Sequence, residues 1–139
     1  MTKSEYEKLA DFRYELRKFL NFSERAAEAD GLAVQQYLAL LAIEGFPGRN
    51  HVTIGELAER LQILSHSAVG LVDRLADAGL VTRQTPVEDR RKVNVTLTAM
   101  GRTKLKKLAE AHREELQTAG PLLAGLLKQI SVPPSPTRQ

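Results

Sequence analysis

Residues 80–97 read LVTRQTPVEDRRKVNVTL, and within this stretch the spacing of hydrophobic residues changes from a helical to an extended pattern. Residues 80–84 are typical of a strand, and residues 92–97 alternate strictly between polar and apolar side chains, as a half-buried strand does. Residues 85–91 are polar and carry both acidic and basic side chains. The stretch therefore predicts a β-hairpin with a charged tip.

Two short helices are expected before the hairpin. Thr53 and Glu56 have the spacing of a capping box, in which each side chain binds a backbone amide of the other's turn, and they predict a helix over residues 54–61. Residues 62–64 form a brief connection, and a second helix is expected over residues 65–78. Two helices joined by so short a turn predict a helix-turn-helix, whose second helix can lie in the major groove of DNA.

The second of these helices has an apolar and a polar face. Ser65 can cap its first turn, and Gly79 suits the left-handed conformation beyond its end. Its inward stripe is expected to be Ala68, Leu71, Val72 and Leu75. The opposite face begins with small polar residues, which allow close approach to a groove and can bind base edges or phosphates. The candidate DNA-binding residues on this helix are Ser65, His66, Ser67, Val69 and Arg74.

The tip of the hairpin supplies a second set of candidates. Arg90 and Arg91 stand beside Glu88 and Asp89. Arginine suits a narrow minor groove, where the negative potential is enhanced. Asp89, two residues before Arg91, can brace that arginine across a tight turn. The alternatives are a solvated turn of mixed charge and, for the helix pair, a helical domain without any role in DNA binding.

Long helices are expected on both sides of this core. Residues 1–30 form one helix that stops at Gly31, and it has more apolar surface than a small domain needs, which indicates packing against a second chain. A helix over residues 33–44 has an expected buried stripe of Val34, Tyr37, Leu38, Leu41 and Ala42. Thr98 is expected to cap a helix that Gly120-Pro121 breaks, with a short apolar helix after the break.

Composition excludes several classes of protein. The chain has no cysteine and three scattered histidines, so we expect no disulfide, metal site or cofactor. It shows no serine–histidine–acid set and no glycine-rich phosphate loop, so we expect no enzyme. It has no apolar run long enough to cross a membrane and no apolar signal core, so we expect a cytoplasmic protein.

The net charge of +3 identifies no partner, and the excess of basic residues lies after residue 92. It consists mostly of Arg102, Lys104, Lys106 and Lys107. A solvated helix face and a surface that meets phosphates are both open for this cluster.

Five segments in register resemble the winged helix-turn-helix of the MarR family, the multiple-antibiotic-resistance regulators. They are residues 53–61 (TIGELAERL), 71–75 (LVDRL), 78–81 (AGLV), 89–91 (DRR) and 97–102 (LTAMGR). The resemblance covers about residues 5–131 when the flanking helices are included. It implies a mainly α fold with a small β-hairpin wing: one domain over residues 1–131, with a core at 33–97, dimerisation helices at 5–30 and 99–131, and a flexible tail at 132–139.

The resemblance also implies a function. It implies a homodimeric repressor, with two recognition helices in successive major grooves of a near-palindromic duplex, about 34 Å apart. Ser65, His66, Ser67 and Val69 fall where the family reads the major groove, and Asp89, Arg90 and Arg91 match the wing. Arg74 is expected to serve phosphate or intradomain contacts rather than bases.

Family members commonly respond to a small aromatic or phenolic ligand, and the candidates for such a pocket are Phe12, Phe19, Phe22, Tyr37 and His66. Aromatic residues at helical spacing are more often part of a hydrophobic core, and that reading stays open. The alternative functions are a winged-helix protein-interaction module and a regulator that binds no effector.

Overall fold

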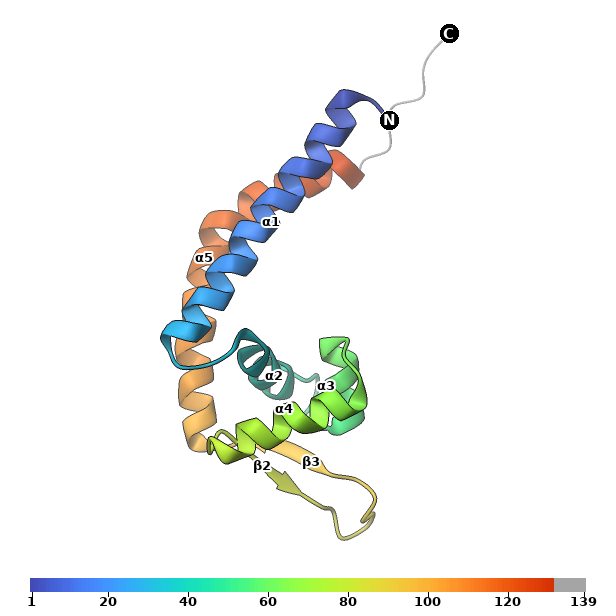
Figure 1. The fold of residues 1–139 in the computed structure, drawn as a ribbon, viewed down its shortest axis with the longest axis vertical. Coiled ribbons are helices and arrows are strands. Elements are labelled where there is room, and N and C mark those ends of the chain that lie inside the picture. Colours follow the sequence, from blue (N-terminus) through green and yellow to red (C-terminus); the bar gives the residue numbers. More distant parts are fainter. Residues whose placement is uncertain (132–139) are drawn as a thin grey trace. The chain divides into compact units, whose positions relative to one another are not determined.

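The expected hairpin is present, and it is part of a small antiparallel sheet in a mainly helical chain (Figure 1). The computed structural model describes residues 1–131. The elements are α1 (Lys3–Ala29), α2 (Val34–Glu44), β1 (His51–Thr53), α3 (Ile54–Leu61), α4 (Ser65–Asp77), β2 (Val81–Gln84), β3 (Asn94–Leu97) and α5 (Ala99–Ser131). The predicted fold class, mainly α with a β-hairpin wing, is confirmed.

The chain divides into two compact units. One unit is residues 26–110, which contain α2, α3, α4 and the sheet, together with the end of α1 and the start of α5. The other is residues 1–25 with the chain from Ala111 onward. The predicted extent of a single domain, residues 1–131, stays a prediction, and the predicted tail at 132–139 lies outside the described residues.

The unit of residues 26–110 has one hydrophobic core between its helices and its sheet. Its largest fully buried side chains are Leu40, Ile43, Leu57, Leu75, Leu80, Val52, Val72 and Val95. The strands are ordered β1-β3-β2, and Val95 of the central strand lies opposite Val52 on one side and Arg83 on the other. Strand β1 follows the loop after α2 and was not predicted, because three residues are too few to show an alternating pattern.

The predicted buried stripe of α2 is wrong in part. Leu38 and Leu41, which were expected inside, are 36% and 41% exposed, whereas Ala39, Leu40 and Ile43 are buried with Tyr37. Helix α2 packs against α3, α4 and β3 at once. Since it also contacts β1, several neighbours surround it, and its buried face is broad and is turned by about one residue from the face that the sequence pattern favours.

Two predicted helix boundaries also differ. Leu64, not Ser65, is the N-cap of α4, and Ser65 is the first helical residue, so its hydroxyl does not cap the helix. Helix α5 runs unbroken through Gly120-Pro121 to Ser131. Proline removes one backbone donor and its ring crowds the carbonyl four residues before it, so it can kink a helix without ending it, and α5 continues on both sides of Pro121. Among residues 1–131, no helix is both long and apolar enough to cross a membrane.

The capping box of α3 is confirmed and has an additional partner. The Glu56 amide donates to Thr53 Oγ1 at 3.2 Å, the Thr53 amide donates to Glu56 Oε1 at 2.9 Å, and Arg49 forms an ion pair with the same carboxylate. Burial favours the neutral form of Glu56, but the hydrogen bonds from Thr53 and the Arg49 guanidinium hold its pKa below the usual value.

We expect Glu56→Gln to lower the free energy of unfolding at pH 7 by about 1 kcal/mol, because glutamine keeps the cap but loses the charge that binds Arg49. The lowered pKa means that the charge stabilises the fold above the ordinary glutamate pKa of about 4.3, and that this contribution disappears as the pH falls through the folded-state pKa. Urea unfolding at pH 7 and pH 3 measures the difference, which should shrink at pH 3. Glu59→Gln, in the same helix, is the control, and a pH-independent difference for Glu56→Gln would contradict this role.

Candidate nucleic-acid interface

Helix α4 has the two faces that the sequence predicts. Ala68, Leu71, Val72 and Leu75 are all buried, with exposures of 3% or less. Ser65, His66 and Ser67 are exposed in the first turn, and Val69 is 44% exposed. Hydroxyls, an imidazole and a methyl-bearing side chain are therefore available together on one surface of a single helix.

The side chain of Arg74 lies over Gly70, which has no side chain of its own. A Cβ atom added at Gly70 would lie 3.5 Å from Arg74 Nη1, so the guanidinium lies back along the helix, over Gly70. Side chains in helices lean toward the N-terminus in this way. Arg74 is exposed, and its charge is thus presented one turn closer to Ser65, His66 and Ser67 than its own backbone is.

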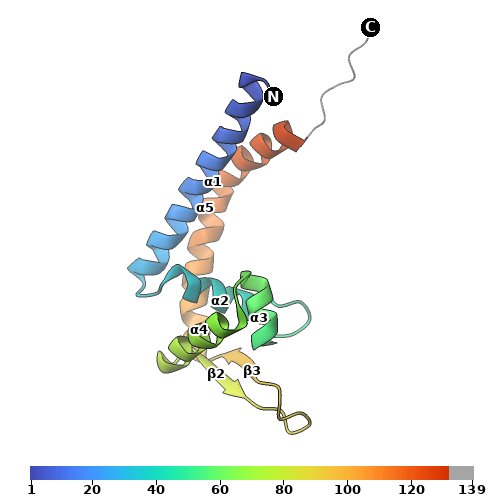
Figure 2. The same cartoon turned by 45° about the vertical axis from the view of Figure 1, so that its right-hand side comes forward.

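The loop between β2 and β3 extends beyond the helices of its unit in both views (Figures 1 and 2). Asp89 braces Arg91 as predicted. Its Oδ1 accepts the Arg91 amide at 3.0 Å and Arg91 Nε at 3.3 Å. The side chain of Arg91 is nevertheless 92% exposed, and Arg90 is exposed beside it. Asp89 thus fixes the backbone amide and Nε of Arg91, while the rest of the guanidinium is exposed and can reach a partner.

We expect Asp89→Ala to weaken binding to a DNA duplex about fivefold, or about 1 kcal/mol, because the hydrogen bonds that hold Arg91 are lost. The direction of the change in affinity is informative, because removing a negative charge alone should strengthen binding to DNA. Glu88→Ala is the matched control, since it removes the same charge from the same loop without breaking a bond to Arg91. Fluorescence anisotropy on one duplex compares them, and unchanged or tighter binding by Asp89→Ala would rule out the bracing role.

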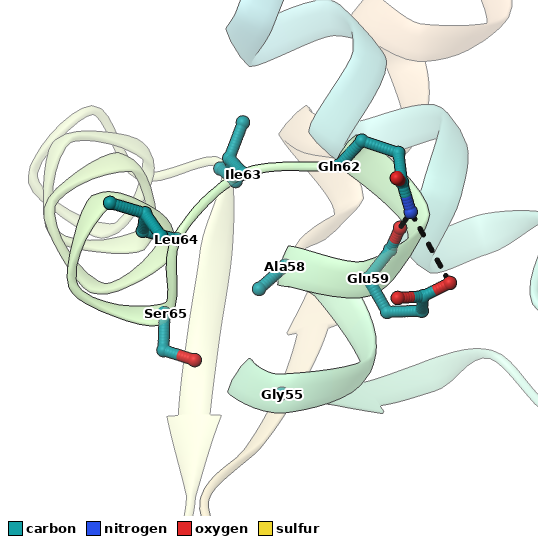
Figure 3. A pocket seen from close by; sticks show the side chains of 7 residues that line it. All are labelled: Gly55, Ala58, Glu59, Gln62, Ile63, Leu64 and Ser65. Atoms are coloured by element: carbon teal, nitrogen blue, oxygen red, sulfur yellow. Dashed lines mark hydrogen bonds between the residues drawn. The ribbon is translucent and has the colours of Figure 1, made fainter.

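A surface hollow lies at the turn between α3 and α4 (Figure 3). Small residues from α3, Gly55 and Ala58, form part of its lining, and Leu64 and Ser65 border it at the start of α4. The Gln62 side chain donates to the Glu59 carbonyl at 2.8 Å, while Gln62 itself has a positive φ of 55° that ends α3. This turn sets the approach of α4 to α3 and leaves the first turn of α4 uncovered.

The sequence motif Leu97-Thr98-x-x-Gly101 joins the wing to α5. The Thr98 hydroxyl donates to the Gly79 carbonyl at 2.6 Å and accepts the Gly101 amide at 3.0 Å, which confirms the predicted cap. A Cβ atom at residue 101 would lie 2.1 Å from the carbonyl oxygen of Leu80. The end of α4, the start of β2 and the start of α5 therefore meet at this motif.

The basic cluster at the start of α5 is largely engaged within its own unit. Arg102 donates to the Leu97 carbonyl at 3.0 Å. Lys104 donates to the Asp30 carbonyl at 2.9 Å, and Lys107 binds the Asp30 carboxylate at 3.0 Å. These contacts hold α5 to the end of α1, which favours a structural role over a surface that meets phosphates.

An ion pair between Asp73 of α4 and Arg83 of β2 was not predicted. A signal for it exists in the sequence. In a strand with alternating faces, Arg83 shares the inward face with Val81, and Asp73 follows the buried Val72. The side chain of Arg83 is nevertheless 44% exposed, so burial alone does not demand an acidic partner.

The residues predicted for a ligand pocket fall in both units. Phe19 and Phe22 pack edge-on against His112, at centroid distances of 6.3 and 5.7 Å, and His112 Nε2 lies 2.6 Å from Ser23 Oγ. Phe12 is half-buried in the same unit. In the other unit, Tyr37 is a core residue whose pKa is raised by burial, and His66 is exposed on α4.

Among the described residues, no group of three or more histidine or acidic side chains could hold a metal ion.

A helix-turn-helix followed by a two-stranded wing defines the class of protein: a winged helix-turn-helix. The sequence model of the MarR family matches residues 30–92, which span α2, α3, α4, β2 and most of the loop between β2 and β3. The winged helix-turn-helix of this chain is thus similar to that of the MarR family over these residues.

Two curated relatives are regulators of transcription. The "Transcriptional activatory protein BadR" of Rhodopseudomonas palustris is 35% identical over 86 residues, which are 62% of this chain and 49% of BadR. The "HTH-type transcriptional repressor YetL" of Bacillus subtilis is 29% identical over 97 residues, which are 69% of this chain and 57% of YetL. The match thus spans about half of the length of these relatives.

A similar solved structure is a mutant of MepR from S. aureus bound to an oligodeoxyribonucleotide. Its TM-score is 0.68 at 21% sequence identity, and the likeness covers 91% of this chain and 96% of that chain. At this identity the likeness shows that the fold is shared along nearly the whole chain.

Proposed function

We propose that the protein is a sequence-specific regulator of transcription that binds double-stranded DNA as a homodimer. The observation that carries the proposal is the wing: Asp89 holds the base of Arg91, while the arginine side chain is 92% exposed beside Arg90. An exposed arginine on a braced loop suits the minor groove, where the potential is most negative. The DNA-bound MepR structure, with the same fold, supports this use of the fold.

In this proposal α4 reads bases in the major groove through Ser65, His66, Ser67 and Val69. The first three are polar and exposed, and Val69 offers methyl groups to a thymine. Arg74, lying over Gly70, supplies a positive charge to the same surface, toward a phosphate. Cytoplasmic location follows from such a role if the protein acts on chromosomal DNA.

Selection of bound duplexes from a random pool tests sequence-specific binding. We expect recovery of a near-palindromic site whose half-sites are about one helical turn, about 34 Å, apart. Recovery of no enriched sequence would leave the alternative of a winged-helix protein-interaction module. One relative is named as an activatory protein and the other as a repressor. A reporter placed behind the selected site then tests the repression that we propose.

The dimer is supported by apolar side chains that the chain leaves exposed in the unit of residues 1–25 and 111–131. They include Leu9, Leu20, Leu116, Leu122 and Leu127, which are 42–50% exposed. Exposed apolar surface of this kind marks an interface. We expect a dimeric mass by light scattering at micromolar concentration, and a monomeric mass would contradict the homodimer.

Modulation by a small aromatic or phenolic ligand is a further part of the proposal, with Phe12, Phe19, Phe22, Tyr37 and His66 as candidates. A ligand can alter DNA affinity only if it binds one conformation of the dimer better than the other. Repeating the duplex titration with aromatic acids and phenols tests this. Affinity that no ligand changes supports the alternative of a regulator without an effector.

A further inference from the structure

The ion pair between Asp73 and Arg83 connects the proposed recognition helix to the wing. Asp73 lies in the second half of α4, and Arg83 lies in β2, where it is paired in register with Val95 of β3. Residue 83 is therefore the last but one residue of β2, close to the loop that carries Asp89, Arg90 and Arg91. The pair thus joins the two surfaces that would contact DNA, at the point where the wing leaves the sheet.

Stability does not account for this pair. The side chains of Asp73 and Arg83 are 51% and 44% exposed, and ion pairs at such positions contribute between nothing and about 1 kcal/mol. The pair can matter more for geometry, because β2 is only four residues long and the pair adds a side-chain contact from α4 near its outer end. A contact from α4 to Arg83 restricts how far the hairpin can swing relative to the helix.

The pair also removes an unfavourable charge. Asp73 precedes Arg74 on α4, and an unpaired carboxylate there would repel DNA phosphates. Asp77, at the end of the same helix, carries the same charge but is not paired with Arg83. Asp73 therefore contacts the wing and Asp77 does not pair with Arg83. Comparing variants of the two residues distinguishes an effect of charge from an effect on the position of the wing.

We propose that Asp73 and Arg83 are positioning residues that fix the wing relative to α4, so that the major-groove and minor-groove contacts form together. This inference rests on the proposed DNA binding and deepens it. It predicts that the pair contributes to affinity only when the duplex is long enough to reach the wing. A direct bond from Arg83 to DNA predicts instead that Arg83 contributes with or without Asp73.

The test uses the full chain and two duplexes that contain the selected site, one with flanks for the wings and one trimmed to the bases under α4. We expect Asp73→Asn to weaken binding to the long duplex about fivefold and to leave the short duplex unchanged. Asp77→Asn is the matched control and should weaken neither. Equal weakening on both duplexes, or tighter binding like that from a simple loss of charge, would overturn the inference.

A double-mutant cycle with Arg83→Gln separates positioning from direct contact. On the long duplex, the double variant should bind about as weakly as either single variant, because each single change already breaks the pair. Additive losses would show that Arg83 contacts DNA itself, and would overturn the inference.

A second measurement needs no DNA and so remains decisive if the wild-type chain binds no duplex. Residual dipolar couplings of the amides in residues 85–93 report the orientation of the wing relative to α4. Asp73→Asn should change these couplings, while Asp77→Asn should leave them as in the wild type. Unchanged couplings in Asp73→Asn would overturn positioning, whereas changed couplings without any DNA binding would refute only the proposed function.

Discussion

Replacement of both Arg90 and Arg91 by alanine is expected to weaken binding to the selected duplex about a hundredfold at moderate salt. Both side chains are exposed at the tip of the wing, and Arg91 is held there through its backbone by Asp89. Each lost phosphate contact should also reduce the steepness of the salt dependence by about 0.9 in the logarithmic plot. Fluorescence anisotropy at several salt concentrations measures both quantities on the same duplex.

The control for this variant removes two positive charges elsewhere. Lys3 and Arg13 are exposed on α1, so Lys3→Ala/Arg13→Ala lowers the net charge equally. We expect it to change affinity little, because neither residue belongs to α4 or the wing, the surfaces proposed to bind DNA. If the wing variant bound as well as this control, direct contact of the wing with DNA would be excluded.

Gly101→Ala is expected to be the most destabilising single substitution that the structure predicts. A Cβ atom at this position would lie 2.1 Å from the backbone oxygen of Leu80 and 3.1 Å from its carbonyl carbon. The Leu80 carbonyl cannot move away easily, because it accepts the amide of Thr98 at 3.0 Å. We expect a loss of about 3 kcal/mol in the free energy of unfolding, toward the upper end for overpacking.

Gly125→Ala, in the same helix, is the matched control. A Cβ atom there has no neighbour within 4 Å, so alanine should be neutral or stabilising by up to about 1 kcal/mol. Urea unfolding followed by circular dichroism compares the two variants. Equal stability of Gly101→Ala and Gly125→Ala would contradict the close packing of α5 on the start of β2.

The motif Leu97-Thr98-x-x-Gly101 thus has a physical explanation that its spacing alone did not reveal. The sequence predicted that Thr98 caps α5, but the bond from its hydroxyl to Gly79 joins residues 19 apart in the chain. Gly101 is required by the close approach of the carbonyl of Leu80, the residue before β2. Contacts between elements of this kind depend on tertiary packing, which local spacing does not encode.

The hairpin and α4 were predictable because their patterns are regular. The alternation in residues 92–97 placed Val95 and Leu97 inside, and the four inward residues of α4 were all identified. The buried face of α2 was not, since a helix with several neighbours has apolar residues on more than one side. Ser65 was mistaken for a cap because serine is common in both the cap and the first turn.

The same contrast between local patterns and tertiary contacts applies to the residues of the candidate site. Residues on one local segment, such as Asp89 and Arg91, were assigned a bond from their spacing, and that bond is present. The pair of Asp73 and Arg83 joins two elements and emerges only when β2 is placed on α4. The sequence leaves two roles possible for Lys104 and Lys107, a solvated helix face or a surface that meets phosphates. Both residues contact Asp30, so a cluster of basic residues need not face a partner.

The central claim is that exposed cations on α4 and the wing bind the phosphates and bases of duplex DNA. The most direct measurement is the affinity of the full chain for the selected duplex between 50 and 300 mM salt, roughly the range over which phosphate contacts dominate. The account predicts a linear decrease in the logarithm of the association constant, with a slope of about −4 or steeper for a dimer that makes several phosphate contacts. An affinity independent of salt, or equal for the selected and a scrambled duplex, would contradict it.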